Sequence, residues 1–219
     1  MEKQLTEFMS CDSRLEARER VQNRVLLALL IVNAAMFCVE AVAGILASSS
    51  ALLADSLDML ADATVYGIAL YAVGKPYSAK RRAAFISGTF QGLLGLMVAG
   101  DVIRRLLFGS EPISLAMIAV GAVALAANVF CLWLLRHERH GEVHIRASWI
   151  FTRTDALANI GTVFGGVMVL VTNSATPDLI VGGAICLVVF YGCFEIIREA
   201  ASDPAQTCPA RIVGKANRK

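Results

Sequence analysis

Six long apolar stretches alternate with short polar or charged segments along this chain. A helix that crosses the hydrocarbon core of a bilayer needs roughly 20 mainly apolar residues. Windows of about that length span residues 24–47, 51–73, 84–101, 113–135, 147–171 and 179–197. The pattern therefore predicts an all-α integral membrane protein with six transmembrane helices.

Composition supports a membrane protein and leaves little chain for anything else. Of 219 residues, 57% are hydrophobic and only 17% are charged, and the mean hydropathy of +0.63 exceeds that of an ordinary soluble domain. The first apolar stretch lacks a small-residue cleavage site, so we expect a retained span rather than a signal peptide. The expected organisation is a polar arm (1–23), a membrane domain (24–197) and a short tail (198–219). A lipid bilayer is the expected surrounding, and the net charge of +2 gives no indication of a nucleic-acid partner.

The positions of lysine and arginine predict how the chain is oriented. Most of them lie in the amino-terminal arm, in the loops 75–82 and 136–146, and in the tail, whereas the turns 48–50 and 172–178 contain none. Because Lys and Arg concentrate in cytoplasmic loops, we expect both termini in the cytoplasm. A bacterial inner membrane is the expected location of such a multi-pass protein.

Three aspartates interrupt the second apolar stretch. On a helix, Asp58 and Asp62 lie one turn apart on one face, and Asp55 lies one turn earlier on the same stripe. Ionisable groups inside a span are costly, and neighbouring carboxylates repel each other unless protons or a cation neutralise them. The stripe therefore indicates a cation site, with Asp55 expected at its mouth.

The fifth stretch carries a second set of oxygen ligands. Asp155 and Asn159 are one helical turn apart, and in antiparallel spans they fall near the same depth as Asp58 and Asp62. Oxygen-rich sets of this kind suit divalent cations such as Zn²⁺ and Mn²⁺. The alternative is a buried ion pair with Arg153, but one arginine cannot neutralise three acids.

Other polar residues give weaker indications. Asn33 and Glu40 are candidate accessory ligands, with hydrogen bonding between helices as the alternative, and Thr152 is a further candidate ligand. Imidazole is a good ligand for Zn²⁺, so the loop histidines could capture metal on the cytoplasmic side, although a short polar loop needs no metal. These histidines are His137, His140 and His144. Asp101, Asn128 and Glu195 receive no assignment.

The residues around these acids resemble those of a known family. The segment 52–62 (LLADSLDMLAD) resembles the second-helix motif of the cation diffusion facilitators, in which a His or Asp and a second Asp four residues later bind the transported metal. The segments 146–149 (RASW) and 155–159 (DALAN) resemble its fifth-helix motif, and Pro177-Asp178 resembles the start of its sixth helix. The resemblance covers the six spans, roughly residues 26–197, and implies a cation-efflux-type helix bundle.

The same resemblance implies a function. We expect a transporter, not an enzyme, that exports a divalent cation from the cytoplasm by proton antiport, with Zn²⁺ first among Zn²⁺, Mn²⁺, Fe²⁺, Co²⁺ and Cd²⁺. The metal would be the substrate, and no organic cofactor is expected. A membrane sensor or partner subunit that binds metal without moving it is the alternative.

Two departures from the family bear on this expectation. The fifth-helix position that normally carries a metal-binding His is Phe151, so Asn159, Thr152 or an oxygen from the first span would have to complete the site. We expect no counterpart of the family's cytoplasmic carboxy-terminal domain, which helps the dimer form, and this leaves the formation of a homodimer open.

Overall fold

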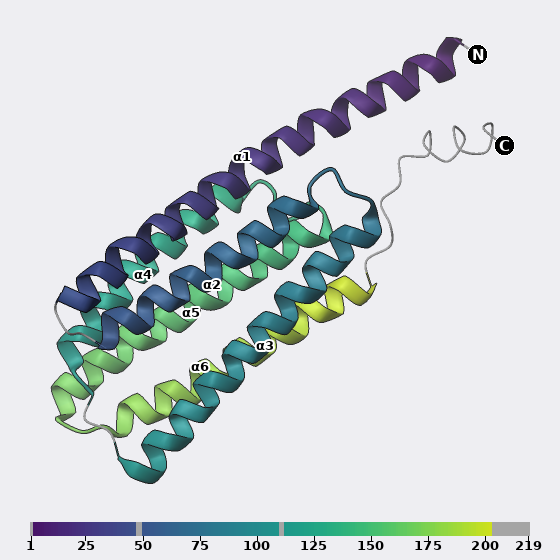
Figure 1. Cartoon of the computed structure of the whole chain (residues 1–219). Coiled ribbons are helices and arrows are strands. Elements are labelled where there is room, and N and C mark those ends of the chain that lie inside the picture. Colours follow the sequence, from purple (N-terminus) through teal and green to yellow (C-terminus); the bar gives the residue numbers. More distant parts are fainter. Residues whose placement is uncertain (1, 47–49, 110–111, 203–219) are drawn as a thin grey trace.

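The computed structural model consists of six helices over its described residues. The backbone is described for residues 2–46, 50–109 and 112–202, and side chains for 16–42, 56–109 and 112–202. The helices are α1 (Glu2–Leu46), α2 (Ser50–Ala72), α3 (Tyr77–Phe108), α4 (Ser114–Leu135), α5 (Val143–Thr172) and α6 (Thr176–Ser202). They run alongside one another as an elongated bundle, and α1 begins near the end at which α6 terminates (Figure 1).

The predicted membrane architecture is confirmed. Among the described residues, five segments are long and apolar enough to span a bilayer, namely Glu16–Val42, Tyr77–Phe108, Ser114–Leu135, Val143–Thr172 and Thr176–Ser202. The remaining helix, α2, lies alongside α1 for much of its length (Figure 1). Its described part contains Asp58 and Asp62, two of the acids predicted to bind the cation.

The helices α1, α3, α5 and α6 are longer than the apolar windows predicted, whereas α2 and α4 match theirs closely. The helix α1 includes nearly all of the polar arm, α3 extends well beyond residues 84–101, and α6 continues to Ser202. Hydropathy marks only the part of a helix that lies in lipid, whereas Glu, Arg, Lys and Ala sustain helix in water as well. The connection between α2 and α3 is correspondingly short and contains Gly74, whose φ of 71° suits glycine best.

Glycines allow α3 and α6 to approach closely. A Cβ atom added at Gly88 would lie 2.9 Å from Ile196 Cγ2, and one at Gly95 would lie 3.1 Å from Val189 Cγ1. The helix α5 packs against α6 in the same way, because a Cβ at Gly161 would lie 3.2 Å from Ile185 Cγ1. Small residues at such contacts are the usual means of packing helices in membranes.

Ion pairs join the helices at both ends of the bundle. At one end, called here the Lys80 end, Lys80 Nζ lies 2.6 Å from Glu142 Oε1, and Arg146 Nε of α5 lies 2.8 Å from Glu199 Oε2 of α6. At the opposite end, called the Asp178 end, Arg105 of α3 lies 2.9 Å from Asp178 of α6. The polar residues predicted to bind metal lie between these two ends.

Candidate metal site

A cavity of about 330 Å³ within the bundle is lined by all four residues predicted to bind the cation. Asp58 and Asp62 reach it from α2, and Asp155 and Asn159 reach it from α5. The helices α3, α4 and α6 complete its wall. The structure therefore brings together two helical faces that are about 90 residues apart in sequence, and metal binding by these residues stays a prediction. We call this space the acid cavity.

Two of the carboxyl groups are direct neighbours. Asp62 is 3% exposed, Asp155 is hydrogen-bonded to it, and Asp58 is close enough to act on Asp155 electrostatically. The Oδ2 atom of Asp155 is buried without a hydrogen-bond partner. Because bare carboxylates at hydrogen-bonding distance repel each other, this pair needs a shared proton or a cation.

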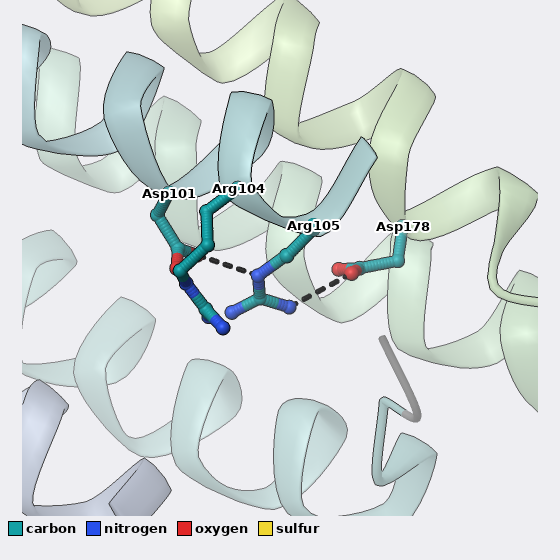
Figure 2. A network of polar contacts seen from close by, with 4 residues as sticks. All are labelled: Asp101, Arg104, Arg105 and Asp178. Carbon is teal, nitrogen blue, oxygen red and sulfur yellow. Dashed lines mark hydrogen bonds and ion pairs between the residues drawn. The ribbon is translucent and has the colours of Figure 1, made fainter. Parts of the chain in front are cut away.

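Arginine does not neutralise these acids. Arg153, the counter-charge considered from the sequence, instead pairs with Glu195 of α6. Of the described residues that line the acid cavity, Arg105 is the only cationic one. It lies between Asp101, at 2.5 Å, and Asp178, at 2.9 Å (Figure 2). The acid cavity therefore keeps an excess of negative charge that a cation would balance.

The acids do not form a closed metal cage in this conformation. Among the described side chains, no three His, Cys, Asp or Glu residues are close enough to hold a metal ion. Asp62 and Asp155 are neighbours, whereas Asp58 is more exposed. The side chain of Asp55 lies outside the described residues, so its expected place at the mouth stays a prediction. Binding by all three acids would therefore require Asp58 to move towards the pair.

A second hollow connects the acid cavity with the Asp178 end. Its volume is about 430 Å³, and it shares Asp58, Leu94 and Arg105 with the acid cavity. It continues to Asp101 and Asp178, where α3 ends and α6 begins. In this conformation the acids are therefore accessible from the Asp178 end. At the Lys80 end, ion pairs hold α3, α5 and α6 together.

Phe151 occupies the position at which the resemblance implies a histidine. It is 1% exposed and lines the acid cavity one turn before Asp155. Its ring also belongs to an apolar cluster that includes Val65, Ala84 and Ile196. The ring thus takes the space in which an imidazole would approach a metal.

The accessory candidates lie elsewhere in the bundle. Thr152 Oγ1 is 2.8 Å from the hydroxyl of Tyr66, and Asn33 Nδ2 donates to Cys131 Sγ at 3.4 Å. Glu40 is 4% exposed on α1. None of the three is among the described residues that line the acid cavity. Asn33 and Thr152 both make hydrogen bonds between helices, which for Asn33 was the alternative to metal binding.

The loop histidines are not brought together. His144 is 1% exposed, and neither of its ring nitrogens has a hydrogen-bond partner. His137 and His140 are exposed, and each accepts a hydrogen bond from the arginine before it, Arg136 at 3.3 Å and Arg139 at 3.1 Å. This arrangement gives no support to a shared metal-capture site, which stays a hypothesis.

Two residues of the acid cavity were missed from the sequence. Gln91 of α3 and Asn128 of α4 both line it, and each is 1% exposed. The signal was a carboxamide inside an apolar span. Like an aspartate there, a carboxamide needs a polar partner, but its burial costs less free energy. Asn128 was noticed without an assignment, and Gln91 was not singled out.

Comparisons with known proteins point to one family. A family model described as the cation efflux transmembrane domain matches residues 26–203. The chain is 24% identical over 216 residues to the zinc transporter ZitB of Yersinia pseudotuberculosis, a match that covers 91% of this chain and 68% of that protein. It is 23% identical over 203 residues to a cadmium, cobalt and zinc/H⁺-K⁺ antiporter of Bacillus velezensis, covering 86% of this chain and 65% of that protein.

Proposed function

The chain belongs to the cation efflux family, and on that premise we propose that it carries a divalent metal cation out of the cytoplasm in exchange for protons. Similarity to a zinc transporter and to a cadmium, cobalt and zinc antiporter supports Zn²⁺ as the first substrate to test. Because Phe151 provides no imidazole, this site should favour harder ions such as Mn²⁺ or Fe²⁺ more strongly than a site with a nitrogen ligand does.

The observation that carries this proposal is the acid cavity itself. Asp62, which is buried, and Asp155, which is half-buried, form a hydrogen-bonded carboxyl pair between α2 and α5. Asp58 lines the same space. The nearby arginines are engaged by other acids. A stabilising role alone would not require three carboxyl groups around a cavity large enough for an ion and several waters.

The carboxyl pair supports coupling to protons. When Asp62 and Asp155 share a proton, a cation that binds between them must displace it, since metal binding and protonation compete for the same oxygens. Protonation on the other side of the membrane would then help to release the cation. Movement of the helices that switches access between the two ends would complete the cycle.

The direction of transport follows from the proposed topology. With both termini in the cytoplasm, as the distribution of Lys and Arg favours, the Lys80 end faces the cytoplasm and the Asp178 end faces outward. The acid cavity continues to the Asp178 end, so this conformation corresponds to the outward-facing state of such a cycle. An inner bacterial membrane is the proposed location.

Uptake of Zn²⁺, Cd²⁺ and Mn²⁺ into proteoliposomes under a proton gradient tests the proposal. We expect Asp58→Ala, Asp62→Ala and Asp155→Ala each to abolish uptake while leaving the protein folded. The control is Glu16→Ala, because Glu16 is exposed outside the acid cavity and, among the described residues, pairs with Arg20 on its own helix. Parent-like uptake by all three aspartate variants would place the site elsewhere, and binding without uptake by the parent would favour the sensor.

A further inference from the structure

The acid cavity contains two carboxamides to which the mechanism above gives no role. Within the part of the chain that the structure describes, neither the Nε2 nor the Oε1 atom of Gln91 has a hydrogen-bond partner, and the same holds for Asn128 Oδ1. Both side chains are 1% exposed and line the acid cavity. Buried polar atoms in proteins are nearly always hydrogen-bonded, so unpaired amides beside a cation site indicate a partner other than the protein.

Packing fixes the position of the Gln91 amide. A Cβ atom added at Gly192 of α6 would lie 2.7 Å from Gln91 Nε2 and 2.3 Å from Thr154 Oγ1. The amide of α3 therefore lies against the backbone of α6, next to a side chain of α5, in space that only glycine leaves free. It cannot turn towards α6 to find a partner, because Gly192 offers no side chain there.

We propose that Gln91 and Asn128 bind the transported cation, each through its carboxamide oxygen. This inference rests on the proposed function and names ligands that the motif on α2 and α5 does not contain. Asp62 and Asp155 would balance the charge of a divalent cation, and the two neutral amides would add oxygen ligands without adding further negative charge. An amide nitrogen and oxygen exchange places by rotation of the side-chain amide, so the oxygen can be the atom that faces the ion.

The ligand set has a consequence for selectivity. Carboxylate and amide oxygens suit hard cations, whereas imidazole and thiolate favour Zn²⁺. With Phe151 in place of an imidazole, amides from α3 and α4 supply the missing coordination as oxygen. The substrate class is therefore a divalent cation that accepts an all-oxygen site, with Mn²⁺ the first ion to compare with Zn²⁺.

Calorimetric titration of the purified, detergent-solubilised protein with Mn²⁺ and with Zn²⁺ tests this inference. Gln91→Met and Asn128→Leu remove an oxygen at similar volume, and we expect each to raise the Kd for Mn²⁺ by about tenfold or more. Because the lost ligand is an oxygen, the Kd for Zn²⁺ should rise less. Gln91→Glu places a charged oxygen at the same point and should lower the Kd for Mn²⁺.

Gln22→Met is the matched control. Gln22 is fully buried on α1, both of its amide atoms also lack a hydrogen-bond partner, and it is not among the described residues that line the acid cavity. Losing this unpaired amide should leave both dissociation constants unchanged. A structural effect of removing any buried amide would appear in this variant as well.

The outcomes separate this inference from the proposed function. Parent-like affinities in folded Gln91→Met and Asn128→Leu, or equal weakening in Gln22→Met, would overturn the ligand roles while leaving the carboxyl site intact. If Gln91→Met fails to fold, Gln91→Glu provides the test instead. An unchanged Kd for Mn²⁺ in Gln91→Glu would also overturn the ligand roles. Unchanged affinity in Asp62→Ala would instead show that the acid cavity is not the binding site.

Discussion

Two glycines on α6 provide a sharp test of the packing around the acid cavity. At Gly183, an added Cβ atom would meet no described atom within 4 Å apart from the adjoining backbone of its own helix. At Gly192 on the same helix, it would lie 2.3 Å from Thr154 Oγ1 and 2.7 Å from Gln91 Nε2. The same substitution, glycine to alanine, should therefore change the free energy of unfolding in opposite directions at the two positions.

The expected magnitudes follow from these contacts. Replacing glycine by alanine inside a helix stabilises it by up to about 1 kcal/mol, and Gly183→Ala should show this gain in the free energy of unfolding. Gly192→Ala has the same gain, but the new methyl group must displace Thr154, whose hydroxyl donates to Ile150 O at 2.9 Å. Losing such a bond costs about 0.5–1.5 kcal/mol, and an extra methyl group in a filled core costs about 1–3 kcal/mol. The net effect should be a loss of about 1–3 kcal/mol.

Reversible unfolding in mixed micelles with increasing dodecyl sulfate, followed by circular dichroism, measures both variants against the parent. Gly192→Ala should also displace the Gln91 amide and weaken Mn²⁺ binding, whereas Gly183→Ala should leave binding unchanged. Equal stability of the two variants, within about 0.5 kcal/mol, would refute the close contact of α6 with Thr154 and Gln91.

Three further predictions concern topology, selectivity and the outer mouth. In a cysteine-free background, an impermeant thiol reagent added outside intact cells should label a cysteine at Asn173 but not one at Lys75; the reverse pattern would invert the proposed direction of transport. Phe151→His should lower the Kd for Zn²⁺ relative to Mn²⁺, because a nitrogen ligand favours Zn²⁺, and an unchanged ratio in folded protein would mean that the ring position does not reach the ion. Asp178→Asn should slow uptake without changing equilibrium affinity, because Arg105 would keep only one of its two carboxylate partners at the mouth; a parallel change in Kd would place Asp178 in the binding site itself.

The acids could be predicted from the sequence because charge inside a membrane is conspicuous. Asp58, Asp62 and Asp155 stand out against apolar surroundings, and the helical period alone places the first two on one face. Their convergence depends on how α2 and α5 are rotated about their axes, which the sequence does not state directly. Here the burial cost of the carboxyl groups is sufficient to turn both faces inward.

Neutral amides and ion pairs were harder to predict for a related reason. An amide such as Gln91 costs less to bury than a charge, so hydropathy barely registers it, and its facing depends on the fit between α3 and α6. Arg153 seemed the natural partner of the nearby Asp155 by sequence distance. In the structure it pairs with Glu195, because α6 packs beside α5 and presents its own acid there.

The distribution of polar groups among the helices bears on how binding and movement could be linked. The carboxyl groups come from α2 and α5, whereas Gln91 comes from α3, which packs along α6 through Gly88 and Gly95. A ligand set contributed by several helices holds the cation fully only in one relative placement of those helices. If Gln91 binds the cation, a shift of α3 relative to α2 and α5 would remove that ligand while leaving the acids in place, and protons could then compete more effectively for the carboxylates. Cation affinity would thus depend on conformation without any change in the carboxyl pair, and this is the property that transport in one direction requires.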